Sequence, residues 1–270
     1  MAVTTVGKIV GNALSEEETI ALNGPHPRYH FHGWAGDIIS GDSKFFDRTA
    51  LGNHAVRGAN LSEANMLANT GYVSTLNPSV GATDSVLRIP NLNFDYAGGE
   101  KFILYWLGKL TPEGGASAEW LGDGYNTSNR GINLRSTAAG MLMFVLCGNT
   151  LAYTNDSTVA PFDGTLHSFA ITIDGVAKTY SMWVDEVINR NTFSLGATAY
   201  DTRNSVTFNI GSVIAAPGNS TEAYGADTQT RALHILRLSA TDTMPSNATL
   251  TNVFKQLRVN PSKPILGSAF

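Results

Sequence analysis

Short runs in which apolar and polar residues alternate are the main pattern of this 270-residue chain from residue 37 onward. In the segment 167–173, the apolar side chains of Phe169, Ile171 and Ile173 alternate with small or polar residues. A period of two predicts a strand with one buried face. Similar runs, bounded by clusters of Gly, Asn, Asp and Pro, predict strands over residues 85–89, 102–107, 132–135, 141–147, 166–173, 179–184, 206–210 and 232–238.

Two turns and one helix complete this pattern. Asp174-Gly175 predicts a hairpin with a five- or six-residue connection, and Asp185-Glu186 predicts the next turn. Ser246 follows Pro245 and is a good N-cap, and apolar residues then recur with helical spacing until Asn260-Pro261 ends the helix. These helix positions are Leu250, Val253, Phe254 and Leu257.

The first 36 residues differ from the rest of the chain. Residues 1–22 have a weakly helical middle, and the Asn, Gly and Pro residues of the segment 23–27 predict a turn. We therefore expect an N-terminal arm or attachment segment over residues 1–36 and one β-sandwich over residues 37–270. Trp34, at the junction, could anchor a partner chain or cover an open edge of the sandwich.

Composition narrows the classes of function. Charged residues make up 15% of the chain, against roughly 25% in an average globular domain, which argues against long solvated helices. The net charge is −4 and no run of Lys or Arg occurs, so nucleic acid is not an expected partner. Neither a secretory signal nor a membrane-spanning apolar stretch is visible, which predicts a protein made in the cytoplasm without membrane insertion.

Catalytic patterns are missing from the sequence. Sandwich glycosidases need two carboxylates on one strand face, for which Glu-x-Asp-x-Glu is the natural spacing, and no such run occurs. No Gly-x-Ser-x-Gly motif occurs either. His30 and His32, with His26 nearby, have a spacing compatible with a transition metal, but ordinary strand histidines are the competing explanation. We expect no enzymatic activity.

The central hairpin carries a family resemblance. Segments 163–175 and 180–185 resemble the central hairpin of concanavalin A-like, laminin-G-type jelly rolls, although Glu186 stands where that family usually has Gly. Segments 88–96 and 100–107 resemble another strand pair of the same family. The resemblance covers about residues 37 to 264 and implies an all-β, antiparallel, concanavalin A-like jelly-roll sandwich.

The end of the C-terminal helix carries a second part of the resemblance. The segment 257–261, Leu-Arg-Val-Asn-Pro, resembles the "L-x-x-N-P" helix common in bacteriophage and prophage members of this family. The resemblance implies a virion protein that contacts other virion proteins through its N-terminal arm and forms a homo-oligomer. Because this sandwich serves lectins, glycosidases and structural proteins alike, the fold alone does not define the function.

The loop 122–130 is the richest candidate for ligand binding. Its carboxylate, amide, aromatic and guanidinium groups suit a sugar, whose hydroxyls bind polar groups while its C–H face packs on a ring. The competing explanation is that Asp, Asn, Gly and Ser residues only form turns here. The candidate ligand-binding residues are Trp120, Asp123, Tyr125, Asn126, Asn129 and Arg130, of which Asp123, Asn126 and Asn129 are weak candidates for a Ca²⁺ site; no other cofactor is expected.

Two functions are therefore expected from the sequence. The first is a lectin-like bacteriophage virion protein that recognises host-surface glycans from the tail, baseplate or capsid surface. The alternative is a structural capsid-decoration or baseplate protein that has no glycan ligand. An endoglycosidase is a weaker third hypothesis because the paired carboxylates are missing.

Overall fold

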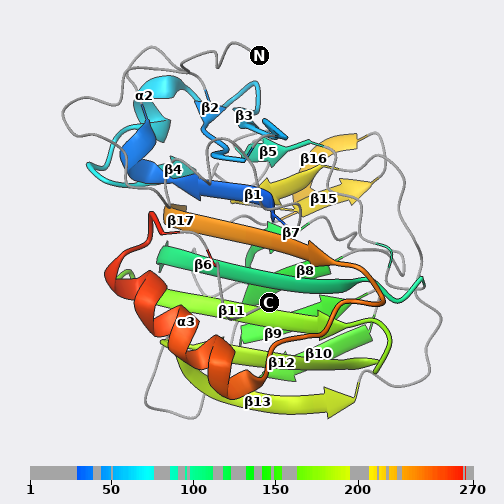
Figure 1. The fold of residues 1–270 in the computed structure, drawn as a ribbon. Coiled ribbons are helices and arrows are strands. Elements are labelled where there is room, and N and C mark those ends of the chain that lie inside the picture. The colour runs from blue at the N-terminus through cyan, green and yellow to red at the C-terminus, as the bar shows by residue number, and fades with distance from the viewer. Residues whose placement is uncertain are drawn as a thin grey trace, which may run out of the picture.

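The computed structural model describes residues 29–38, 44–49, 51–75, 86–90, 95, 98–111, 118–122, 132–136, 142–146, 149–153, 163–194, 207–211, 213–216, 219–223, 227–263 and 265. These residues form two antiparallel β-sheets that pack face to face, and a long helix lies on the outer side of the first sheet (Figure 1). The arrangement confirms the predicted all-β sandwich.

Sheet A carries the helix. Its strands follow the order β1, β17, β6, β11, β12 and β13, and β4 pairs with the beginning of β17. The strands are β1 (Tyr29–Trp34), β4 (Val73–Thr75), β6 (Lys101–Thr111), β11 (Leu166–Asp174), β12 (Thr179–Val184), β13 (Val187–Ser194) and β17 (Asp227–Leu238).

Sheet B forms the opposite layer, in the order β10, β9, β8, β7, β14, β5, β3 and β2. Its strands are β2 (Lys44–Phe45), β3 (Ala55–Arg57), β5 (Leu87–Ile89), β7 (Ala118–Gly122), β8 (Ile132–Ser136), β9 (Leu142–Leu146), β10 (Asn149–Tyr153) and β14 (Phe208–Ile210). The remaining elements are the ribbon of β15 (Val213–Ala216) and β16 (Asn219–Ala223), the 3₁₀ helix η1 (Ala35–Asp37), and the helices α2 (Glu63–Met66) and α3 (Asn247–Val259).

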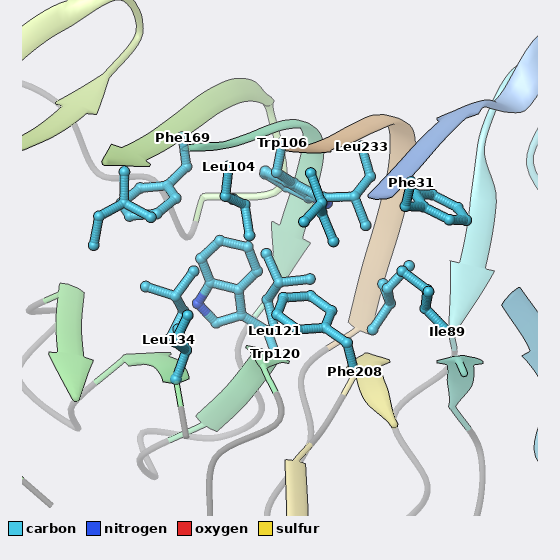
Figure 2. Close-up of a cluster of buried hydrophobic side chains, with 14 of the residues drawn as sticks. Phe31, Ile89, Leu104, Trp106, Trp120, Leu121, Leu134, Phe169, Phe208 and Leu233 are labelled. Carbon is cyan, nitrogen blue, oxygen red and sulfur yellow. The ribbon is translucent and has the colours of Figure 1, made fainter. Parts of the chain in front are cut away.

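The main core fills the space between the two sheets. Trp106 and Phe169 of sheet A face Trp120 and Phe208 of sheet B (Figure 2). Trp106 and Trp120 lie 5.0 Å apart between ring centroids. Alternation along β6, β11 and β14 turns Trp106, Phe169 and Phe208 toward the core. In β7 a bulge allows the consecutive residues Trp120 and Leu121 both to face it.

Helix α3 covers the outer face of sheet A and creates a second apolar cluster. Phe254 stacks on Tyr105, with 5.4 Å between ring centroids, and lies edge-on to Trp183 at 5.1 Å. Trp183 Nε1 donates to Thr251 Oγ1 over 2.8 Å, which fixes the helix along β12. Ser246 accepts a hydrogen bond from the Thr249 amide, so the predicted N-cap is confirmed. No helix in the described ranges has the length and apolar character needed to cross a membrane.

The central hairpin is confirmed, with one correction. Strands β11 and β12 pair from Phe169 with Val184 to Asp174 with Thr179. Residues 175–178 alone therefore connect them, which is shorter than the five or six residues expected from the sequence. The Asp174 side chain explains the shorter turn, because its Oδ1 accepts from the amides of Val176 and Ala177, both over 2.9 Å.

The sandwich begins earlier than the boundary expected at residue 37. Strand β1 pairs with β17, and Phe31 lies in the main core, so residues 29–36 belong to the sandwich; residues 1–28 lie outside the described ranges. Trp34 ends β1, and the Arg48 guanidinium lies 5.0 Å from its ring. Its predicted alternatives, partner anchor or edge cover, stay open.

Three side chains hold the segment that follows α3. His234 Nε2 donates to the Pro261 carbonyl over 3.1 Å, and Arg48 Nη1 donates to the Ser262 carbonyl over 2.8 Å. The Ile265 amide donates to the Tyr29 hydroxyl. We call this arrangement the C-terminal clasp. It joins the first described strand to the last described residues on the outer side of sheet A.

Candidate functional site

Trp120 was expected in the ligand-binding set, but the structure corrects this assignment. Its side chain is 1% exposed and packs edge-on against Phe169, with 5.7 Å between ring centroids (Figure 2). A bulge in β7 between Glu119 and Leu121 allows both Trp120 and Leu121 to join the main core. The indole ring is therefore not available to a sugar at the surface.

The other candidates, Asp123, Tyr125, Asn126, Asn129 and Arg130, lie outside the described residues, so both their role and the Ca²⁺ site stay predictions. The strands on either side of the loop are described. Gly122 ends β7, and it pairs with Asn133 of β8 and Asn209 of β14. A Cβ at Gly122 would lie 2.2 Å from the Ile132 carbonyl oxygen, so the close approach of these strands requires glycine.

A row of polar side chains crosses the outer face of sheet B at this point. Register places Arg88 of β5 opposite Asn209, and Asn209 opposite Gly122, which in turn pairs with Asn133. The sequence neighbours of these three residues lie in the main core, so alternation turns Arg88, Asn209 and Asn133 outward. We call these three residues the outer row.

The outer row contains a hydrogen-bonding group that is not used. Asn209 is 1% exposed, and its Oδ1 accepts from Thr207 Oγ1 over 3.1 Å. Its Nδ2 has no partner among the described residues. An unsatisfied buried amide costs about 1–3 kcal/mol. Asn209 and Asn133 are 1% and 3% exposed, so of the three side chains only Arg88, which is partly exposed, is open to a ligand at the surface.

A cluster of titratable side chains lies at another corner of the molecule, where β11, the β12–β13 turn and the end of α3 meet. His167 Nδ1 lies 2.7 Å from Asp185 Oδ2, and its Nε2 lies 3.1 Å from Asp163 Oδ1. Arg258 Nη1 donates to Asp185 Oδ1 over 2.7 Å, and its Nη2 donates to the Leu166 carbonyl over 3.1 Å. We call Asp163, His167, Asp185, Arg258 and the adjacent Glu186 the corner cluster.

The turn in the corner cluster is unusual in its residues. Asp185 has φ 48° and Glu186 has φ 60°, the left-handed region in which glycine is favoured, so Glu186 adopts the backbone geometry expected of the family's Gly. The Glu186 carboxylate is buried, accepts from Ser168 Oγ and lies 3.6 Å from Arg258 Nη1. Burial raises its pKa. These contacts offset the backbone cost of about 1–2 kcal/mol.

The corner cluster has the chemistry of an anchor. The hydrogen bond to Asp185 raises the pKa of His167, despite partial burial. Burial would raise the pKa of Asp185, but hydrogen bonds from His167 and the Ser168 amide lower it overall. A protonated imidazole between two carboxylates donates both N–H groups and has no free lone pair for a general base. The cluster ties the end of α3 to the sandwich.

Replacement of the anchor histidine should make stability depend differently on pH. Because the folded pKa of His167 is raised, its contribution is complete below pH about 6.5 and is lost as the pH rises through the folded value. His167→Gln should therefore lower the free energy of unfolding by about 1–2 kcal/mol near pH 6, and by less at pH 9. Urea unfolding across this range measures the difference. A difference that grows with pH would contradict the assignment.

Metal binding receives no support from the described residues. No group of three or more His, Cys, Asp or Glu side chains within them is placed to hold a metal ion. His32, a candidate from its spacing with His30, is fully buried and stacks on His234, with 4.4 Å between ring centroids. Its ring therefore belongs to the packing beneath the C-terminal clasp.

Comparisons with known proteins identify the fold but no family. No protein-family model matches the sequence, and no curated protein matches it. The binding domain of botulinum neurotoxin serotype D is 12% identical over 85% of this chain and 52% of its own, with a TM-score of 0.55. A Trypanosoma rangeli sialidase in complex with sialic acid is 13% identical over 80% of this chain and 32% of its own, with a TM-score of 0.53.

A smaller module is also similar. The CBM40 of the Ruminococcus gnavus IT-sialidase, bound to α2,3-sialyllactose, is 18% identical over 67% of this chain and 99% of its own, with a TM-score of 0.44. The toxin domain and the T. rangeli sialidase establish that the chain shares a β-sandwich architecture with parts of larger proteins. This chain spans about half of the first and a third of the second.

Proposed function

We propose that this protein is a non-catalytic β-sandwich of a bacteriophage virion and that it binds host-surface glycans. The observation that carries the proposal is the outer row, where the partly exposed Arg88 lies in register with the buried Asn209 and, beyond Gly122, with the buried Asn133. The loop that begins after Gly122 and returns before Ile132 leaves the sheet beside this row. Its Asp123, Tyr125, Asn126, Asn129 and Arg130 would add the carboxylate, ring, amides and second guanidinium to the site.

The chemistry of this set fits a sugar better than an apolar ligand. Amide groups can both donate to and accept from sugar hydroxyls, and an arginine can hold two adjacent oxygens with its planar fork. The strand pairing of β5 and β14 keeps Arg88 in fixed register with Asn209, and a rigid backbone reduces the entropy lost on binding. The fold neighbours whose names include sialic acid or sialyllactose are consistent with this class of ligand.

The end of α3 supports a role in a virion, and the arrangement of carboxylates supports a protein without catalytic activity. Helix α3 ends at Val259 before Asn260-Pro261, as the motif shared with bacteriophage members implies. In addition, the sequence lacks Glu-x-Asp-x-Glu, and the described carboxylates of the corner cluster are bound to His167, Ser168 and Arg258. In this proposal the N-terminal residues bind other virion proteins, the protein forms a homo-oligomer, and the loop can bind Ca²⁺.

Removal of the Arg88 guanidinium should weaken glycan binding without unfolding the protein. Screening the wild type on a glycan array identifies a ligand, and titration then compares Arg88→Ala and Asn133→Ala with Lys255→Ala, an exposed change on α3. Arg88→Ala should reduce affinity about tenfold, the equivalent of about 1.4 kcal/mol, whereas Asn133→Ala, a change at a buried side chain, should have a smaller effect. The Lys255 variant should bind like the wild type, and melting curves should show that all three are folded.

Two outcomes would contradict the proposal. Equal glycan affinity of the wild type and the Arg88→Ala variant would remove this face of sheet B from the site. A wild-type protein that assembles into particles but binds no glycan would favour the structural alternative, a decoration or baseplate protein. Asp123→Ala and Tyr125→Ala extend the test to the loop.

A further inference from the structure

A second polar surface lies on the outer face of sheet A, beyond the end of α3. Register places Ser74 of β4 opposite Gln229 of β17, and Gln229 opposite Lys109 of β6 (Figure 1). The adjacent residues Thr230 and Leu110 face the other way, since Thr230 Oγ1 accepts from Trp106 Nε1 in the core and Leu110 belongs to the main core. Ser74, Gln229 and Lys109 therefore point outward.

The turn before β4 adds two more side chains to this surface. The Lys109 ammonium lies 4.9 Å from the centroid of the Tyr72 ring. Asn69 Nδ2 donates to Ser74 Oγ over 2.9 Å, which leaves the Asn69 carbonyl oxygen as an acceptor. We call Asn69, Tyr72, Ser74, Lys109 and Gln229 the β4 platform.

The β4 platform is open where the rest of this face is covered. Helix α3 and the C-terminal clasp cover the outer face of sheet A with Leu250, Phe254, Leu257 and Ile265. By contrast, Asn69, Tyr72, Lys109 and Gln229 are each partly exposed, and only Ser74 is buried. A ligand can therefore reach four of the five side chains.

The charge on the platform is not neutralised within the described residues. Among them, no carboxylate lies within 4.0 Å of Lys109 Nζ, and the Gln229 side chain makes no hydrogen bond. Asp163 precedes by three residues Leu166, the residue of β11 that pairs with Lys109, and its carboxylate accepts from Thr165 and contacts His167. An unpaired ammonium held over an aromatic ring beside a free amide favours an anion that also carries hydroxyl or acetamido groups.

We propose that the β4 platform binds an acidic saccharide. Its carboxylate lies against the Lys109 ammonium, its hydroxyl or acetamido groups bind the amides of Gln229 and Asn69, and a C–H face of its ring packs against Tyr72. An acidic peptide would use the lysine alone and would leave the ring and the two amides unoccupied. The site lies on sheet A and the outer row on sheet B, so variants of one can be tested without changing the other.

Galacturonic acid and galactose form a matched pair of probes, because they differ only in the carboxylate at C6. Titration of the wild-type protein, followed by NMR, should show saturable binding of galacturonic acid and much weaker binding of galactose. Lys109→Met keeps most of the side-chain length without the charge and should reduce affinity for the acid about tenfold. Higher ionic strength should also weaken binding.

Control variants separate this site from the outer row. Lys255→Met removes an exposed charge from α3 and should change nothing, and Arg88→Ala should leave galacturonic acid binding intact. Gln229→Ala provides a second platform variant and should weaken both sugars. Equal binding of galactose and galacturonic acid, unchanged affinity in Lys109→Met, or no saturable binding by the wild type would each overturn the proposal.

Discussion

Acidification from pH 7 to pH 5 should lower the free energy of unfolding by about 2 kcal/mol for each of two buried histidines. The slope of about 1.4 kcal/mol per pH unit applies only below the unfolded pKa of about 6.5, that is, over about 1.5 of the two pH units. Burial lowers the pKa of His32 well below its usual range, with smaller effects from His234 and Arg48. Burial likewise lowers the pKa of His234 to about 3. The unfolded chain therefore binds protons near pH 6.5 that the folded chain does not, so stability falls as the pH drops.

The variant His32→Leu isolates one half of this effect. Neither ring nitrogen of His32 has a hydrogen-bond partner among the described residues, so an apolar side chain of similar size loses no bond there. Urea unfolding between pH 7 and pH 5 should show about half the wild-type loss in this variant. His167→Gln serves as a control, because its pH effect has the opposite sign. An unchanged slope in His32→Leu would disprove the assignment.

Trp120→Ala should destabilise the protein by about 3–5 kcal/mol, because it leaves a cavity among Trp106, Phe169 and the other residues between the two sheets. Thermal or urea unfolding measures the loss. Val187→Ala, an exposed change on sheet A, should cost little and serves as the control.

The milder variant Trp120→Phe distinguishes a core residue from a sugar-binding one. It should keep the fold and the glycan affinity of the wild type, since the ring does not reach the surface. A folded Trp120→Phe protein that has lost its glycan affinity would restore Trp120 to the ligand-binding set.

Alternation and capping made the central strands and the helix predictable. In β11 the apolar residues Phe169, Ile171 and Ile173 enter the core at every second position, and Ser246 begins α3 as its sequence context indicates. The first part of β17 was missed because Thr228 and Thr230 occupy its inner positions. A threonine that satisfies a buried tryptophan N–H has no apolar signature in the sequence.

The candidate sites were less predictable because they depend on register. Arg88, Asn133 and Asn209 are far apart in the sequence, and each is a single polar residue between apolar neighbours. Only the pairing of β5, β14, β7 and β8 brings them into one row. The corner cluster was closer to prediction, since the resemblance already identified the strands that carry His167 and Asp185, but their contact with Arg258 required the position of α3.

The C-terminal clasp also determines how this unit can be joined to something larger. Since the Ile265 amide donates to the Tyr29 hydroxyl, the first and last described residues of the sandwich lie together on the side that α3 covers. Units whose ends meet are readily inserted into other chains without strain. A sandwich attached to another protein at this point would expose the outer face of sheet B on the side away from the attachment.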